Sequence, residues 1–364
     1  MHHAVDHDRR RLLALAAGLA ATPALALGAA SVARAADRAP AAGAAPGPAP
    51  AGALSMGLLR NPVSGLIELA SQKGWFREAG LAFSPVLFAG AGGPKVIQAM
   101  GGGSIALGSV SVTAALLALG SGAVPLSIVS ISTDPSPAFV VIAAPDIRTL
   151  HELKGKRVAT TAGTGLQYFL ARALGTAGMS LADVEFVNLP VGDAQSAFLA
   201  GRVDAVVPSL NGRYYIRGIR KDAHELFTYE DFAKAPGGPA RFEDYDVFVA
   251  PRSVVTSQRE ALRAFLAAYH GKAVPYLLAP ATHATAVSEI TRYVNAEQKS
   301  PTDEAAMRQQ LEASRFFDQG QARAIMQSPA FRAGLEDQIR FFADAKKLPA
   351  SMSLDGVIAS GLLG

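Results

Sequence analysis

From residue 54 to residue 207 the sequence alternates short apolar runs with amphipathic segments, and this alternation constrains the fold more than any other feature. Leu54–Leu59 is the first apolar run, and residues 64–73 then carry apolar side chains at helical spacing. Strands are expected at 81–87, 105–108, 124–131, 139–143, 157–161, 184–188 and 205–207, and helices at 95–100, 113–119, 165–175 and 193–200. Strands separated by helices predict an α/β fold whose parallel sheets are covered by helices on both faces.

The remaining length and composition indicate a globular chain with more than one lobe. The chain has 364 residues, of which 50% are hydrophobic and 18% are charged, enough for two domains with their own cores. From Arg259 onward the sequence is mostly helical. A helix is expected to begin at Pro301, with Ser300 as its cap and Asp303 in its first turn.

The first 35 residues have the features of an export signal. Arg9, Arg10 and Arg11 precede an apolar stretch that ends at residue 30, and Ala33-Arg34-Ala35 is a small-x-small cleavage site. Residues 1–35 are therefore expected to be a signal peptide, twin-arginine-like or of the general secretory type, cleaved near Ala35 to leave a periplasmic protein. Residues 36–53 are rich in Ala, Pro and Gly and are expected to form a disordered linker.

Composition also argues against several functional classes. The chain has no cysteine, so it has no disulfides, thiol nucleophiles or thiolate metal sites. Its net charge of +4 comes partly from the leader, and no basic run with interleaved aromatic residues predicts nucleic-acid binding. The segment 108–112 resembles a nucleophile elbow but ends in Val112 instead of glycine, and the histidines are not spaced as metal ligands. We therefore expect no enzyme, no cofactor and no metal.

Four segments in order carry a family resemblance. Residues 71–81 read SQKGWFREAGL, residues 150–159 read LHELKGKRVA, and residues 197–205 read AFLAGRVDA. The fourth is Tyr245–Arg252 followed by Ala261–Tyr269, a later strand and helix. Together they resemble the nitrate/sulfonate/taurine-type periplasmic solute-binding proteins of ABC importers. Two departures stand out: residues 103–106 lack the family's aspartate, and Ser209 stands where the family often has tryptophan, so the aromatic ligand platform is absent.

The resemblance implies a two-lobed, type II periplasmic-binding-protein fold with the ligand held between the lobes. The crossings are expected near 132–139 and 243–248, the first lobe at 54–134 plus 249–364, and the second at 135–248. The implied function is capture of a small anionic solute by a monomer and its delivery to the transmembrane subunits of an ABC permease. The alternatives are a periplasmic sensor with the same cleft, or an enzyme related to pyrimidine-precursor synthases, which use a cysteine that this chain lacks.

Small polar residues mark four predicted strand-to-helix junctions, at 61–64, 109–111, 161–165 and 209–211. Ligands of open α/β sheets bind beyond the carboxyl ends of the strands, where helix N-termini expose unpaired N–H groups that suit an anion. Arg60 and Arg213 flank the junctions and could grip an anion through two hydrogen bonds; the alternatives are plain helix caps and solvated surface arginines. The predicted ligand-binding residues are Arg60, Asn61, Ser64, Ser109, Ser111, Thr164, Gly165, Gln167, Ser209, Asn211 and Arg213. Sulfonates, taurine, nitrate, aromatic carboxylates and pyrimidine precursors all remain possible ligands.

Overall fold

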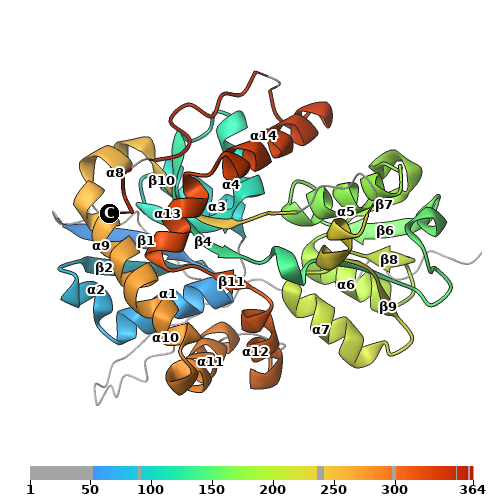
Figure 1. Ribbon diagram of the computed structural model, residues 1–364, viewed down its shortest axis with the longest axis horizontal. Helices are drawn as coiled ribbons and strands as arrows, with labels where there is room; N and C mark the ends of the chain where they lie inside the picture. The colour runs from blue at the N-terminus through green and yellow to red at the C-terminus, as the bar shows by residue number, and fades with distance from the viewer. Residues whose placement is uncertain are drawn as a thin grey trace, which may run out of the picture. The chain divides into compact units, whose positions relative to one another are not determined.

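A computed structural model describes residues 52–88, 92–235, 242–296, 301–349, 351–359 and 361–363 (Figure 1). The predicted signal peptide and almost all of the predicted linker lie outside the described residues, as does Ser300. In the part that is described, the strands form two sheets, here called sheet A and sheet B. No helix of that part is both long enough and apolar enough to cross a membrane.

Sheet A has six strands in the order β11-β4-β10-β3-β1-β2. Strand β1 pairs in parallel with β2 and with β3, and β10 runs antiparallel to β3 and β4. The strands of sheet A are β1 (Ala53–Leu58), β2 (Ala82–Leu87), β3 (Leu107–Ser111), β4 (Leu126–Asp134), β10 (Asp246–Pro251) and β11 (Arg315–Phe316).

Sheet B has five strands in the order β7-β6-β8-β5-β9. Strand β6 pairs in parallel with β7 and β8, whereas β5 runs antiparallel to β8 and β9. The strands of sheet B are β5 (Val140–Ala143), β6 (Arg157–Thr160), β7 (Glu185–Asn188), β8 (Ala205–Val206) and β9 (His224–Thr228).

Helices cover both sheets, as the alternating sequence pattern predicts. Those that come before or after sheet B in the chain are α1 (Pro62–Gln72), α2 (Trp75–Glu78), α3 (Gly93–Gly101), α4 (Val112–Gly120), α8 (Arg252–Ser257), α9 (Arg259–Ala268), α10 (Val274–Leu278), α11 (Pro280–Asn295), α12 (Glu304–Glu312), α13 (Gln319–Met326) and α14 (Pro329–Asp344). Those between the strands of sheet B are α5 (Gly165–Thr176), α6 (Val191–Leu199) and α7 (Leu210–Ile219). Short 3₁₀ turns lie at Ser136–Ala138, Leu150–Leu153, Leu181–Asp183 and Tyr229–Ala233, and a π-helical turn at Tyr269–Ala273 joins α9 to α10.

The predicted α/β class is confirmed, but the expectation of parallel sheets is wrong for strands β5, β9, β10 and β11, which pair antiparallel with their neighbours. The chain leaves sheet A at the end of β4 and enters sheet B as β5, and it returns as β10. Both strands that enter a sheet from the other sheet, β5 and β10, run antiparallel to their neighbours, because they are not reached through a right-handed βαβ crossover. Strand β9 pairs with β5 alone and is antiparallel to it.

Two predicted boundaries are also wrong. Helix α12 begins at Glu304, not at Pro301, because the carboxylate of Asp303 caps it by accepting from the backbone N–H of Ala306 at 2.7 Å. Strand β3 extends to Ser111, so Ser109 lies inside the strand and not at its junction with α4.

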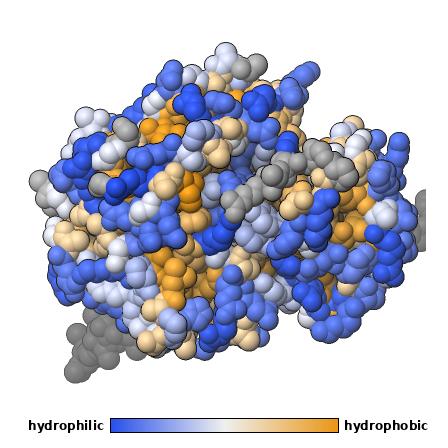
Figure 2. All heavy atoms as spheres, viewed as in Figure 1, coloured by the Kyte–Doolittle hydropathy of each residue, from blue (hydrophilic) through white to orange (hydrophobic). Residues whose placement is uncertain are grey.

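The segments that cross between the sheets are held by aromatic packing and by hydrogen bonds. Phe139 follows the first crossing and Phe242 precedes the second, and their rings lie 5.8 Å apart in an aromatic cluster against sheet B. Phe169 on α5 contacts both rings, at 5.6 and 5.2 Å. On sheet A, Phe248 of β10 packs against Phe265 of α9 at 5.1 Å. In the described part, one buried core contains residues of both sheets and a smaller one lies on sheet B alone, while hydrophilic residues cover much of the face seen in Figure 2.

Candidate functional site

The four predicted junctions lie at the carboxyl ends of two pairs of neighbouring strands. Helices α1 and α4 follow β1 and β3, which are parallel neighbours in sheet A. Helices α5 and α7 follow β6 and β8, which are parallel neighbours in sheet B. Because neighbouring parallel strands end at the same edge of a sheet, each sheet presents two helix N-termini side by side.

The start of α1 uses its polar residues within the protein. Asn61 caps the helix by accepting from the backbone N–H of Ser64 at 2.9 Å, and the buried Ser64 hydroxyl accepts from the backbone N–H of Leu59 at 3.0 Å. The guanidinium of Arg60 donates to the carbonyl of Tyr293 at 2.9 Å and lies 4.6 Å from the centre of that ring. All three residues therefore have structural contacts that a ligand would share or displace.

The start of α4 is fully engaged by neighbouring groups. The Ser111 hydroxyl accepts from the backbone N–H of Ala114 at 3.2 Å, and the backbone N–H of Val112 donates to the carbonyl of Tyr245 at 2.8 Å. Ser109 is buried inside β3, where its hydroxyl lies 3.2 Å from the hydroxyl of Ser132.

The start of α5 has no side-chain cap on its first turn. The Thr164 hydroxyl donates back to the carbonyl of Thr161 at 2.7 Å, and the Gln167 side chain accepts from the backbone N–H of Gly163 at 2.8 Å. Gly165 is buried, and a Cβ atom at this position would lie 1.5 Å from a carboxylate oxygen of Asp244. Position 165 is thus glycine because another side chain takes the space next to it.

The start of α7 is capped by Ser209, whose hydroxyl accepts from the backbone N–H of Gly212 at 3.2 Å and from the Gln195 side chain at 2.8 Å. The Arg213 guanidinium makes two hydrogen bonds of 2.8 Å with the carboxylate of Glu225 and one of 3.2 Å with the carbonyl of Ala138. The side chain of Asn211 lies outside the described part. A ligand at Arg213 would have to share its guanidinium with Glu225.

Burial and the ion pair with Arg213 act in opposite directions on the pKa of Glu225. Burial disfavours the charged carboxylate, but the hydrogen bonds and charge of Arg213 outweigh it, and the pKa of Glu225 is lowered. The predicted anion-binding arginine is therefore already matched with a protein carboxylate.

Asp244, which sequence reasoning missed, joins the α4 and α5 junctions. Its side chain is 2% exposed and lies against Gly165 at the start of α5. One oxygen is 3.1 Å from the Thr113 hydroxyl in the first turn of α4 and 3.4 Å from the Gln338 amide of α14. Its backbone N–H donates to the Ser136 hydroxyl in the first crossing at 2.8 Å. No local pattern marks such a residue, because its contacts are distant in sequence.

Two other carboxylates accompany Asp244 near the crossings. Asp134, fully buried at the end of β4, accepts from the backbone N–H of Ser136 at 2.9 Å and pairs with the guanidinium of Arg315. Burial raises the pKa of Asp244 to about 6, against partial compensation by hydrogen bonds from Thr113 and Gln338. Burial and the charges of Asp244 and Asp134 raise the pKa of Asp246 to about 7.

Helix α14 and helix α12 add contacts to the helices of sheet B. The Tyr168 hydroxyl on α5 donates to the carboxylate of Asp337 on α14 at 2.5 Å, and Arg172 lies 3.3 Å from the same oxygen. The Tyr214 hydroxyl on α7 donates to the carbonyl of Gln309 on α12 at 3.3 Å. Helices α14 and α12, which follow sheet B in the chain, therefore contact α5 and α7 of sheet B.

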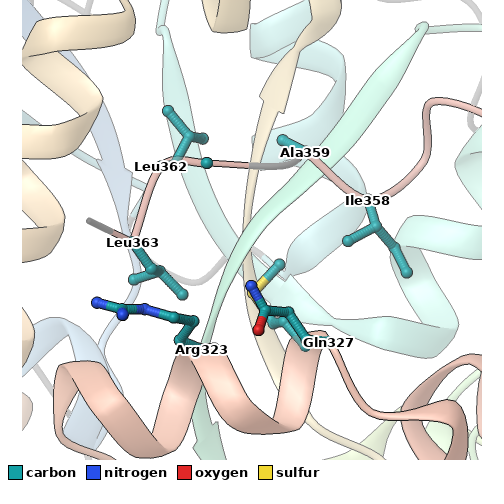
Figure 3. Close-up of a pocket in the computed structure, with 8 residues that line it drawn as sticks. Arg323, Gln327, Ile358, Ala359, Leu362 and Leu363 are labelled. Atoms are coloured by element: carbon teal, nitrogen blue, oxygen red, sulfur yellow. The ribbon is translucent and has the colours of Figure 1, made fainter.

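Two cavities of the described part bear on where a small molecule could bind. A cavity of about 490 Å³ lies between α3 and α4 and is also lined by Gly163, in the loop before α5. A second, of about 360 Å³, lies between α13 and the C-terminal segment that contains Ile358 and Leu362 (Figure 3). Neither cavity is lined by any of the predicted site residues. The second cavity lies toward the opposite end of β4 from the crossing. Ile358, which lines this cavity, forms an isolated β-bridge with Ile128 near the start of β4, whereas the first crossing leaves from the end of β4.

Curated relatives and solved structures are consistent with this geometry. The chain is 29% identical over 231 residues to an Escherichia coli (strain K12) protein named as an aliphatic sulfonates-binding protein. This match covers 58% of this chain and 70% of that protein. It is 28% identical over 207 residues to a Brucella abortus (strain 2308) protein named as a binding protein; this match covers 56% of this chain and spans only 60% of the length of that relative.

Among solved structures, the alkanesulfonate-binding protein SsuA from Xanthomonas axonopodis pv. citri, bound to MOPS, matches with a TM-score of 0.66 and 19% identity. The match covers 85% of this chain and 98% of that one, and at this identity it shows a shared fold. The family model described as NMT1/THI5 like matches residues 61–281, which is more than half of the sequence. The chain therefore belongs to the NMT1/THI5-like family.

Proposed function

We propose that this chain is the solute-binding component of an ABC importer, which captures a small solute between two lobes and delivers it to a membrane permease. The observation that carries the proposal is the meeting of two sheet edges. The junctions after β1 and β3 belong to sheet A, those after β6 and β8 belong to sheet B, and Asp244 contacts both α4 and α5. Sulfonate-binding relatives with similar sequence support the same role.

Each lobe, in this proposal, is one sheet with the helices packed on it. The first lobe corresponds to residues 54–134 with 249–364 and the second to 135–248, except that strand β10 (Asp246–Pro251) pairs in sheet A, so residues 246–248 go with the first lobe. Ligand contacts to both lobes exist only when the lobes are closed, so a ligand shifts the open–closed equilibrium by its differential affinity for the closed state.

We propose a small anion as the ligand, held mainly by backbone N–H groups. Helix N-termini bind anions without a full counter-charge, and the first turn of α5 lacks a side-chain cap. The pairing of Arg213 with Glu225 and of Arg60 with Tyr293 makes these guanidinium groups secondary in the proposal. Side-chain contacts from Asn61, Ser111, Thr164 and Ser209 supplement the backbone groups.

The place of action in this proposal is the periplasm. Residues 1–35 direct export by the twin-arginine or the general route, and residues 36–53 tether the folded part. The protein works as a monomer and binds its ligand without turnover. Related enzymes of this fold use cysteine, which the sequence lacks. A periplasmic sensor with the same cleft is the second candidate, and only the partner protein distinguishes the two roles.

A thermal-shift screen of the full-length chain tests the proposal. The compounds are alkanesulfonates, taurine, nitrate, aromatic carboxylates and pyrimidines, and a compound that binds the folded state raises the melting temperature. Calorimetry with the best compound is expected to give one site per chain, and chromatography of the mixture is expected to return the compound unchanged. Conversion of the compound, or binding of all anions equally, would contradict a specific transport receptor.

A further inference from the structure

The carboxylate of Asp244 lies against the first turns of two helices, α4 and α5. One oxygen lies 3.1 Å from the Thr113 hydroxyl at the start of α4, and the other is close enough to Gly165 at the start of α5 to exclude a Cβ atom there. The residue sits between sheet A and sheet B in the second crossing, and its backbone bonds to Ser136 in the first. It therefore touches both lobes and both crossings.

We infer that Asp244 is a positioning residue for lobe closure: its carboxylate is buried when α5 packs against α4, and it regains water when the lobes separate. The inference rests on the proposed two-lobed function. The contact with Gly165 is the one that opening breaks, because Thr113 and Gln338 lie on the same lobe as the strand that follows Asp244.

Burial of a carboxylate gives this contact a defined dependence on pH. In the buried position the pKa of Asp244 is raised to about 6 from its usual value of 3.8. A pKa that is higher in the closed state than in the open state means that protonation favours closure. The closed state therefore gains population as the pH falls from about 7 toward about 4, and above pH 7 the charged carboxylate opposes closure.

The neighbouring ionisable groups act in the same direction or are already paired. Asp134 and Asp246 face Asp244 from β4 and β10 and, when charged, disfavour its ionisation; Glu243 precedes it in the crossing. From α5, Tyr168 faces it, with its hydroxyl bonded to Asp337 of α14. In the first turn of α4 the facing group is the neutral hydroxyl of Thr113.

Distance measurements between two spin labels test the inference on the full-length chain. The sequence has no cysteine, so labels attach only at Lys221→Cys in sheet B's lobe and Glu304→Cys in sheet A's lobe, two exposed positions. The ratio of the short-distance to the long-distance population is expected to rise about tenfold between pH 7.5 and pH 5. Asp244→Asn, which stays neutral, is expected to show the acid distribution at both pH values, whereas Asp246→Asn keeps a step but moves it to lower pH, because one negative charge near Asp244 is gone.

The possible results of this experiment separate the role of Asp244 from the proposed two-lobed function. A pH step that persists unchanged in Asp244→Asn overturns the role of Asp244 and leaves the two-lobed function intact. A single distance population in every sample contradicts hinged lobes, and with them both the inference and the proposed function. Equal melting temperatures of Asp244→Asn and the parent at pH 5 serve to show that the variant is folded.

Discussion

The first turn of α5 has no side-chain cap and lies against a carboxylate from a distant segment, whereas α1, α4 and α7 are capped by residues at their own starts. Asp244 reaches α4 and α5 from the second crossing, while Asn61 and Ser209 each accept from a backbone N–H three residues later. The α4–α5 side is therefore set for contact between the lobes. On the α1–α7 side both helices are capped locally, by Asn61 and Ser209.

The largest expected effect comes from adding a single methyl group on the α4–α5 side. In Gly165→Ala the new Cβ would overlap a carboxylate oxygen of Asp244 at 1.5 Å, so α5 cannot approach α4 as closely. We expect the affinity for the best screening compound to fall about 100-fold, or about 2.7 kcal/mol, by calorimetry. Gly175→Ala, on the same helix with open space around it, is the matched control. Equal affinity of the two variants would show that this contact is unrelated to binding.

A smaller effect is expected on the α1–α7 side when Arg213 is removed. Arg213→Ala removes two 2.8 Å hydrogen bonds to the partly buried carboxylate of Glu225 and leaves it the more exposed Arg217, 3.3 Å away, at a cost of about 2 kcal/mol in the free energy of unfolding at pH 7. The pKa of Glu225 is lowered in the folded protein, so this stabilisation is present above its usual pKa of 4.5 and is lost as the pH falls through the lowered value.

Denaturant unfolding of Arg213→Ala and the parent at pH 7 and pH 4 measures this difference. The two proteins are expected to differ less at pH 4 than at pH 7. A loss of ligand affinity of about 30-fold without a loss of stability would instead assign Arg213 to the ligand, as the sequence suggests.

The smallest effect is expected from the local caps. Asn61→Ala and Ser209→Ala each remove one side-chain acceptor from a helix start, which costs about 1 kcal/mol of stability. Chemical denaturation checks this value, with Ser121→Ala as a control outside the helix starts. If either variant loses affinity by more than the stability change explains, that side chain also contacts the ligand.

Much of the fold could be predicted from local pattern. The first strand was expected at Leu54–Leu59 and lies at Ala53–Leu58, and the helix expected at 165–175 lies at Gly165–Thr176. The helix expected from Pro301 begins only at Glu304, because Asp303 is its cap and the backbone N–H and C=O of Thr302 are bonded to the side chain of Asn295. The direction of β10 depends on a return from the other sheet, which periodicity does not encode.

The candidate site was only partly predictable. Caps such as Asn61, Ser111 and Ser209 act within three residues, so the local sequence identifies them. The contact of Asp244 with Gly165 spans both lobes, and the pair Arg213–Glu225 joins a helix to a strand through folding alone. Glycine at position 165 was a usable signal, but nothing in the sequence names the side chain that fills the space beside it.

Small-angle X-ray scattering of the full-length chain, with and without the best screening compound, tests the central claim most directly. If a solute is trapped by closure of two hinged lobes, saturating compound lowers the radius of gyration, and the same compound leaves that of Gly165→Ala larger than the parent's. Stoichiometric binding by calorimetry with an unchanged radius of gyration would contradict the account.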